Sequence, residues 1–431
     1  MNRPKSGAVK RFLVANIVPI LFSAICLLGV LFSGSNPAVI LMDVVARFDR
    51  NAFLVLSLII PILTGLGLNF GIVLGAMAGQ AAIFIVCVIG LTGMTAVFIA
   101  AVISIPLAVL FGWLSGLLLN RTKGQEMITS MILGFFAAGV YQFIFLFALG
   151  GIFPIDAPEI MLGTGVGVRN TIDLGNMKYA LDNLWKVDLF TGITLLGALL
   201  LAVNAIRLLR PQNRVRRRIS ITVLWGTVTV FGLVGGRLPQ FASYQMLVKI
   251  PMAPFLLIAG LCLLIPAFLR TKLGQEMRAV GQDMGVAAVA GIDVNRTRII
   301  AICISTVIAA LGQIIFLQNL GNLSTYNAHE NVGMFSAAAL LIGGAAVSKA
   351  TVGQALMGTV LFHLLFNVSP MAGKNLFGSA EIGEYFRVFI AYGIIAVTLA
   401  LSSVCPGMFV LPQKLVNFWF LTQFQSRFGV L

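Results

Sequence analysis

Polar side chains are rare inside the long apolar stretches of this chain, and they are the residues best placed to contact a solute. They are amides and one imidazole: Asn69, Gln80, Gln142, Gln313, Gln318, Asn319, His363 and Asn367. A buried amide or imidazole costs free energy unless it is hydrogen-bonded, so each must face another helix or a water-filled passage. Because amides are uncharged, they suit neutral solutes that are rich in hydroxyl groups.

Two roles stay open for these side chains. Helix bundles in membranes use Asn, Gln and His to bond one helix to another, and transport pathways are lined by polar groups of the same kinds. His363 and Asn367 are four residues apart and share one face of a helix. We predict that seven residues line a pathway: Asn69, Gln80, Gln313, Gln318, Asn319, His363 and Asn367.

The sequence contains no recognisable catalytic or metal-binding motif. Its five cysteines stand singly, without a CxxC pair or a Cys/His cluster, and it has only two histidines, His329 and His363. It also lacks a GxxxxGK[ST] phosphate-binding loop. We therefore predict no catalytic residue, no metal ligand and no cofactor bound by this chain, and we expect that the protein is not an enzyme.

The composition indicates whether this is a soluble or a membrane protein. Of the 431 residues, 59% are hydrophobic and 10% are charged, whereas soluble domains carry about 25% charged residues. A cytosolic enzyme, a secreted disulfide scaffold and a disordered chain are excluded. The composition predicts an integral membrane protein that spans the membrane many times.

Twelve apolar segments approach the length of about 20 residues that spans a bilayer. They lie near 12–34, 52–68, 70–91, 95–118, 128–151, 189–207, 220–236, 250–269, 298–318, 334–348, 353–369 and 385–404. Glycines interrupt the third segment, and the tenth is short, which indicates broken or re-entrant helices. We predict an all-α polytopic bundle of about 10–12 transmembrane helices that forms one domain over residues 1–431.

Lys and Arg gather in alternate connecting segments when the N-terminus is placed in the cytoplasm. The largest basic segments are 208–219 and 270–298, whereas the predicted external loop 152–188 is richer in acids. Because cytoplasmic loops carry the excess of Lys and Arg, we predict that both termini are cytoplasmic. The net charge of +15 then reflects contact with the lipid membrane, not nucleic-acid binding. The tail 405–431 is predicted to be an amphipathic helix on the inner leaflet.

None of the fourteen acidic residues falls in the middle of a predicted span. Carriers coupled to protons or sodium often place an ionisable group at membrane depth. The expected absence of such a group disfavours a self-contained ion-coupled carrier. If the protein moves a solute uphill, we expect the energy to enter through a partner.

Two cytoplasmic segments carry nearly the same string, RTKGQEM at 121–127 and RTKLGQEM at 270–277. Four predicted spans separate them, so the two copies have the same orientation. A parallel duplication of two halves is one hypothesis, and chance similarity is the other.

The second copy leads into a stretch of small residues that is predicted to bind another protein. Two short helices are expected near 274–280 and 283–290, because glycines interrupt this stretch. Its small and capping residues form a surface on which a partner can close tightly: Gly281, Asp283, Gly285, Ala287, Ala288 and Gly291.

The string GQDMGVAAVAGI at 281–292 resembles the cytoplasmic coupling loop of bacterial ABC importer permeases of the ribose, branched-chain amino acid and nucleoside type. Segments 69–80, 125–133 and 336–345 are also similar to segments of that family, and 125–133 is most similar to its nucleoside branch. Ala78 departs from the pattern, because the nucleoside branch has Glu there, and Lys349 stands where sugar permeases have glycine.

The resemblance implies a multi-pass subunit of the cytoplasmic (inner) membrane that imports a nucleoside or a simple sugar. It further implies three kinds of protein partner: an ABC ATPase that binds ATP and Mg²⁺, a second permease in a homo- or heterodimer, and an external substrate-binding protein or lipoprotein. The residues near 281–291 would transmit the motion of the ATPase. The alternative is a self-contained secondary transporter or channel; an intramembrane enzyme is disfavoured because no catalytic group is recognisable.

Overall fold

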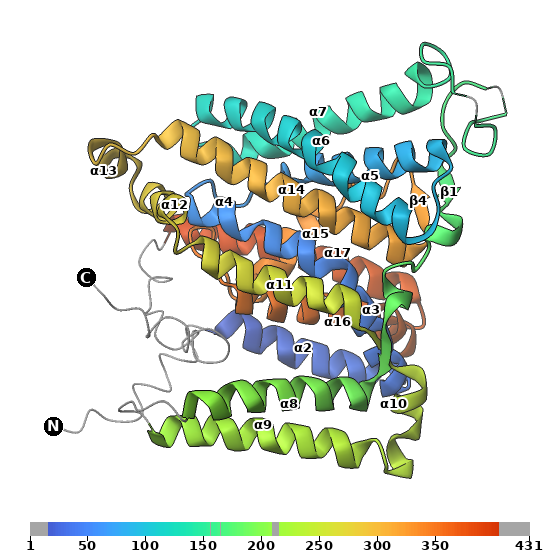
Figure 1. Cartoon of the computed structure of the whole chain (residues 1–431), viewed down its shortest axis with the longest axis vertical. Helices are drawn as coiled ribbons and strands as arrows, with labels where there is room; N and C mark the ends of the chain where they lie inside the picture. Colours follow the sequence, from blue (N-terminus) through green and yellow to red (C-terminus); the bar gives the residue numbers. More distant parts are fainter. Residues whose placement is uncertain (1–15, 156, 164, 209–214, 405–431) are drawn as a thin grey trace.

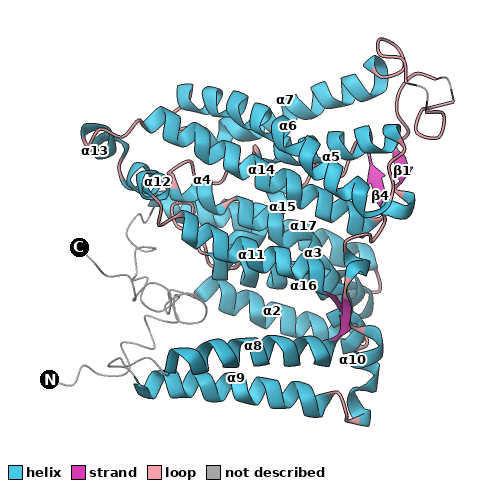
Figure 2. Ribbon diagram, in the orientation of Figure 1, coloured by secondary structure: helices cyan, strands magenta, loops and turns pink. Residues whose placement is uncertain are grey.

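The computed structural model describes residues 16–155, 157–163, 165–208 and 215–404. Helices make up almost all of its regular structure (Figures 1 and 2). The tail 405–431, the start of the first predicted span and the centre of the basic segment 208–219 lie outside the described residues.

The first half of the chain contributes helices α2 to α9, which have these bounds: α2 Ile17–Ser33, α3 Pro37–Ser57, α4 Ile59–Leu63, α5 Ile72–Ile89, α6 Gly93–Arg121, α7 Glu126–Phe143, α8 Leu189–Leu208 and α9 Val215–Gly235. The second half contributes α10 Ala242–Leu247, α11 Met252–Phe268, α12 Lys272–Gln282, α13 Met284–Val289, α14 Val294–Leu320, α15 Val332–Ile342, α16 Val352–Phe377 and α17 Ala380–Val404. A π-helical turn, Ile144–Ala148, continues α7, and single 3₁₀ turns cover Gly175–Met177, Asp182–Leu184 and Pro239–Phe241.

Four three-residue strands pair two by two and in antiparallel fashion. Strand β1 (Thr171–Asp173) pairs with β4 (Asn322–Ser324), and β2 (Lys186–Asp188) pairs with β3 (Lys249–Pro251). Both pairs lie at one end of the bundle, opposite α12 and α13 (Figure 1). They fasten the long segment between α7 and α8 to connections in the second half of the chain.

Helix α14 is the centre of the bundle and packs against α3, α5 and α6, whereas α16 packs against α2, α3, α15 and α17. Glycines allow this close packing: a Cβ atom at Gly79 of α5 would lie 2.6 Å from the carbonyl oxygen of Ala310. Small residues let helix backbones approach closely in membranes, where lipid supplies no hydrophobic driving force. Helices α8 and α9 form a hairpin at the edge of the bundle (Figure 1).

Five described helices are long and apolar enough to cross a membrane: α5, α6, α7 with its π turn, α14 and α16. The pair α11 and α12, bent by 75°, adds a sixth if it is one broken span, and four shorter apolar helices accompany these. The prediction of an all-α polytopic membrane bundle with broken segments is confirmed. Within the described ranges, five or six of the predicted spans meet this length criterion.

Helix α3 differs from the sequence-based expectation. Residues 35–51 were expected to connect two spans outside the bundle, but α3 runs without interruption from Pro37 to Ser57. Asn36 caps its N-terminus and Pro37 occupies the first turn, two signals that favour a helix start at this point. Asp49 is consequently buried between helices. The expectation that residues 35–51 only connect two spans outside the bundle is therefore wrong, and Asp49 is a buried carboxylate within the helix bundle.

Candidate functional site

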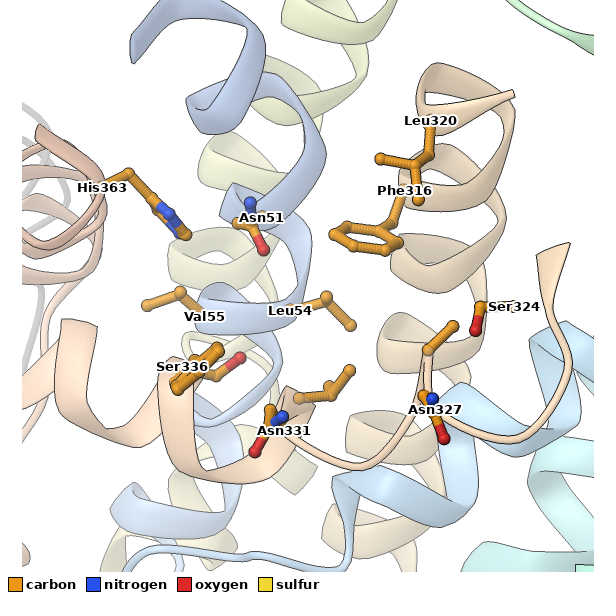
Figure 3. A pocket seen from close by; sticks show the side chains of 13 residues that line it. Asn51, Leu54, Val55, Phe316, Leu320, Ser324, Asn327, Asn331, Ser336 and His363 are labelled. Carbon is orange, nitrogen blue, oxygen red and sulfur yellow. The ribbon is translucent and has the colours of Figure 1, made fainter. Parts of the chain in front are cut away.

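A pocket of about 290 Å³ opens between α3, α14, α15, α16 and the segment 322–331 (Figure 3). Its apolar lining consists of Leu54, Val55, Phe316, Leu320, Ala328, Val332 and Phe335, and its polar lining of Asn51, Ser324, Asn327, Asn331, Ser336 and His363. Small-molecule sites have volumes from about 300 Å³ upwards, so this pocket fits a small solute. None of the lining side chains is acidic, lysine or arginine, which favours a neutral solute.

His363 is the one residue of the seven pathway predictions that lines this pocket. It projects from α16 toward Asn51 of α3 (Figure 3), and no described residue hydrogen-bonds its Nδ1 atom. Asn367 lies one turn further along α16 and does not belong to the lining. A free imidazole nitrogen at the wall of a pocket can hydrogen-bond a solute.

Gln80 and Gln313 bond to the backbone of the segment that lines the pocket. The Nε2 atom of Gln80 donates to the carbonyl oxygen of Ser324 (3.2 Å), and that of Gln313 donates to the carbonyl oxygen of Ala328 (3.2 Å). The two amides therefore hold one wall of the pocket in place.

Gln318 and Asn319 fasten the predicted external loop to α14. Gln318 Nε2 donates to Asp182 Oδ1 (2.8 Å), and Asn319 Nδ2 donates to Asp182 Oδ2 (2.6 Å). Asn319 also lies 3.4 Å from Asp49 Oδ2. Asp49 and Asp182 are both buried, so one amide stands between two carboxylates from distant parts of the chain.

Asn69 stabilises a turn before α5. Its Oδ1 atom accepts a hydrogen bond from the backbone N–H of Gly71 (2.9 Å), which is the usual use of Asn at such turns. The seven residues thus occupy several places in the fold. One lines the pocket, two bond to the segment that forms one of its walls, and the other four lie elsewhere. Their role in a pathway stays a prediction.

The predicted coupling loop forms α12 and α13 at the end of the bundle opposite the pocket (Figure 1). Asp283 caps α13, because its Oδ1 atom accepts from the N–H groups of Gly285 (2.8 Å) and Val286 (3.0 Å). Gly281 packs against the turn after α4, and a Cβ there would clash with the backbone of Leu63. Gly291 ends the loop with φ +82°, which L-residues rarely adopt.

The exposed face of α13 is apolar. Ala287 points inward and is 2% exposed, whereas Val286 is 68% and Val289 is 92% exposed. Ala288 is exposed beside them. The residues predicted from the sequence for this surface are the small ones and Asp283, and they do not include Val286 and Val289. One sequence signal for the two valines was that they flank Ala287 and Ala288 on either side.

A buried ion pair joins this loop to the bundle. Arg298 of α14 is fully buried, and its Nη2 atom donates to Glu126 Oε1 (2.6 Å) and to the carbonyl oxygen of Leu119 (3.2 Å). Its Nη1 atom lies 3.1 Å from the sulfur of Met284 in α13. Arg298 therefore connects α6, α7, α13 and α14. No sequence signal indicated this pair, because 172 residues separate its members.

Glu126 belongs to the first copy of the repeated string, and α12 contains the second copy. The two copies thus lie at the same end of the bundle, which agrees with their equal orientation in the predicted topology. The duplication itself stays a hypothesis.

Helix α14 runs from the Arg298–Glu126 ion pair, beside the predicted coupling loop, to the pocket. Its 27 residues have a length of about 40 Å. Arg298 stands near its first turn, and Phe316 and Leu320 line the pocket from its last turns. The pocket and the coupling loop are therefore at opposite ends of one rigid element.

Comparison with known proteins identifies the family. The sequence profile described as "Branched-chain amino acid transport system / permease component" matches residues 40–399. The chain belongs to this family. The permease is accordingly a multi-pass protein of the cytoplasmic membrane, and the resemblance derived from the coupling loop is confirmed.

Two curated relatives of the permease align over shorter segments. The "Nucleoside ABC transporter permease protein NupB" of Lactococcus lactis subsp. cremoris (strain MG1363) is 30% identical over 139 residues, 32% of the permease and 36% of the relative. The "Probable ABC transporter permease protein YphD" of Escherichia coli (strain K12) is 27% identical over 130 residues, 30% of the permease and 39% of the relative. The permease thus spans less than half the length of either relative. No solved structure matches the chain.

Proposed function

We propose that the permease is the membrane subunit of an ATP-driven importer for a small neutral solute, either a nucleoside or a simple sugar. The observation that carries this proposal is the placement of an uncharged pocket and an exposed apolar docking helix at opposite ends of α14. Family membership and two relatives named as ABC transporter permeases support it.

The lining of the pocket supports a solute with both hydroxyl groups and an apolar face. Asn51, Asn327 and Asn331 offer donors and acceptors to hydroxyl groups. Phe316 and Phe335 offer ring faces against which a nucleobase or the apolar face of a sugar can pack. The name of one relative, a nucleoside permease, favours the nucleoside.

Ala78 carries the main argument for the sugar. It stands where the nucleoside branch has Glu, and it is fully buried against Ala108 of α6 and Ala310 of α14. The three small side chains leave no room for a carboxylate at this position. The simple sugar is therefore the second candidate.

In this proposal, an ABC ATPase binds the exposed apolar face of α13 and supplies ATP hydrolysis with Mg²⁺. Closure of the ATPase displaces α13, and the Arg298 contacts with Met284 and Glu126 transmit the displacement to α14. A second permease completes the passage, and an external binding protein delivers the solute to the strand end of the bundle. Such rigid-body transmission needs a tightly packed joint.

Reconstitution tests the proposal. The full chain is placed in proteoliposomes with its ATPase and binding protein, and uptake of radiolabelled uridine and ribose is measured with ATP and with a non-hydrolysable analogue. We expect uptake of one of the two solutes that requires ATP and the ATPase. Uptake by the chain alone along an ion gradient would instead establish the alternative, a secondary transporter.

A further inference from the structure

Buried polar atoms without hydrogen-bond partners gather around segment 322–331. Within the described chain these atoms are Oε1 of Gln80, Oε1 of Gln313, the Oη atom of Tyr141 and both ring nitrogens of His329. All four residues are at most 7% exposed. Buried polar side chains are normally hydrogen-bonded, so four such residues in one place require an explanation.

The four side chains come from three helices and one connection, and they meet at the same short segment. Gln80 of α5 and Gln313 of α14 donate to the carbonyl oxygens of Ser324 and Ala328. The ring of Tyr141 of α7 lies 4.9 Å from the ring of His329, which follows Ala328 directly.

Segment 322–331 contacts both these side chains and the pocket. Ser324, Asn327, Ala328 and Asn331 line the pocket with one side of the segment (Figure 3). The backbone of the same segment accepts the two glutamine hydrogen bonds. One stretch of non-helical chain thus forms part of a polar pocket and contacts a second polar cluster.

We propose that Gln80, Tyr141, Gln313 and His329 form an inner solute site, and that segment 322–331 is the gate between this site and the outer pocket. The inference rests on the proposed import function and adds a second site to it. When the gate moves, its carbonyl groups release both glutamine amides, and the solute takes their place as hydrogen-bond partner.

The chemistry of the inner site fits an uncharged solute that carries both donors and acceptors. Two amide oxygens accept hydrogen bonds, the phenol and the imidazole can both donate and accept, and none of the four residues is charged when the imidazole is neutral. The outer pocket has the same character. A solute can therefore pass between the two sites without a change in the kind of contact.

The gate is also fastened to the predicted external loop. Thr325 donates from its backbone N–H to the carbonyl oxygen of Asn170 (2.8 Å) and from Oγ1 to that of Arg169 (2.8 Å). Tyr326 Oη donates to the carbonyl oxygen of Val168 (2.7 Å). The gate and residues 168–173 must therefore move together. A displacement of the predicted external loop can thus open the inner site.

Cysteine accessibility tests the gate. In a background whose five cysteines are replaced by Ala and which retains uptake, single variants Gln313→Cys and His329→Cys are exposed to a membrane-impermeant thiosulfonate. Asn327→Cys reports the outer pocket, and Ile302→Cys, buried in α14 away from the proposed sites, is the matched control. Labelling rates are measured at rest and during ATP-driven uptake of uridine or ribose.

We expect Asn327→Cys to react at rest, and Gln313→Cys and His329→Cys to react at least about tenfold faster during uptake, because exposure of a buried site follows its opening. Ile302→Cys should react in neither condition. If the labelling rates at positions 313 and 329 do not change while uptake proceeds, the proposed gate is contradicted and the import function still stands. If the unsubstituted permease shows no uptake of uridine or ribose with its partners, the import function fails, and labelling with saturating uridine or ribose alone, in the cysteine-free background, then decides the gate by the same criterion.

A substitution test does not depend on the folding of the cysteine variants. Gln80→Leu combined with Gln313→Leu keeps the side-chain size and removes both hydrogen bonds to the gate. We expect uptake to fall by about tenfold or more, because the inner site loses two of its hydrogen-bonding groups. Gln142→Leu in α7 is the control. If uptake falls equally in the double variant and in Gln142→Leu, or does not fall in the double variant, the proposal is contradicted.

Discussion

Single residues matter most where a charge is buried. Arg298 has no exposed surface, and its guanidinium group is held by Glu126 and by the carbonyl oxygen of Leu119. Removal of one partner leaves the other as an uncompensated buried charge. The pair therefore fixes how α14 sits against α6 and α7, next to the proposed docking helix.

Arg298→Met should lower the free energy of unfolding by about 3–5 kcal/mol. The reason is that Glu126 then loses its counter-charge while it remains largely buried. Thermal unfolding of the purified permease in detergent measures the effect. Arg296→Met on the same helix is exposed and should change little. The double variant Arg298→Met/Glu126→Met should recover part of the lost free energy of unfolding. If Arg298→Met and Arg296→Met lose the same amount, the buried charge is not the cause.

His363→Leu should raise the KM for uptake about five- to tenfold, because it removes a hydrogen-bonding group from the pocket wall and keeps an apolar side chain in its place. Uptake by proteoliposomes at a series of solute concentrations measures the change. Asn367→Leu, one turn away and outside the lining, serves as the control. If Asn367→Leu has the larger effect, the pocket is not the solute site.

Helix α13 illustrates how an element acquires a function through its exposed face. Its six residues are too few for a stable isolated helix, which needs about 12–15. The Asp283 cap and the inward side chain of Ala287 hold it in place, and Val286 and Val289 remain exposed. Since this end of the bundle carries the basic connections, the valines face the cytoplasm in the predicted topology.

Val289→Glu should abolish co-purification of the ATPase and reduce ATP-driven uptake to background, because the change places a charge in the apolar contact. Folding should be unaffected, since the side chain is 92% exposed. Glu276→Gln, on the neighbouring helix α12, tests whether a charge change nearby has the same effect. Normal ATPase binding by Val289→Glu would show that α13 is not the docking element.

At the scale of the whole molecule, α14 connects two ends with different surfaces. The end with α12 and α13 has an exposed apolar helix, and the other end has the pocket and the strands that hold the segment between α7 and α8 (Figure 1). Asp49 and Asp182 join α3, α14 and this segment through Asn319. A buried acid inside the bundle removes one argument against ion coupling, so ion coupling needs a direct test.

Uptake with ATP should persist when both proton and sodium gradients are collapsed by ionophores, because in the proposed function the energy enters through an ATPase at α13. Proteoliposomes with the full complex, with and without ionophores, provide the measurement. Asp49→Asn should likewise leave the ATP requirement unchanged. Loss of uptake on collapse of either gradient would favour the self-contained carrier.

The sequence by itself determined the membrane bundle, because a chain with 10% charged residues cannot cover a water-exposed surface. It also determined the two short helices α12 and α13, because the glycines and the Asp283 cap act within a few residues of one another. Only the tertiary structure decided which residues share a pocket, where Asp49 lies and that Arg298 pairs with Glu126. These features join residues that are far apart in the chain, and the packing of α14 against its neighbours brings them together.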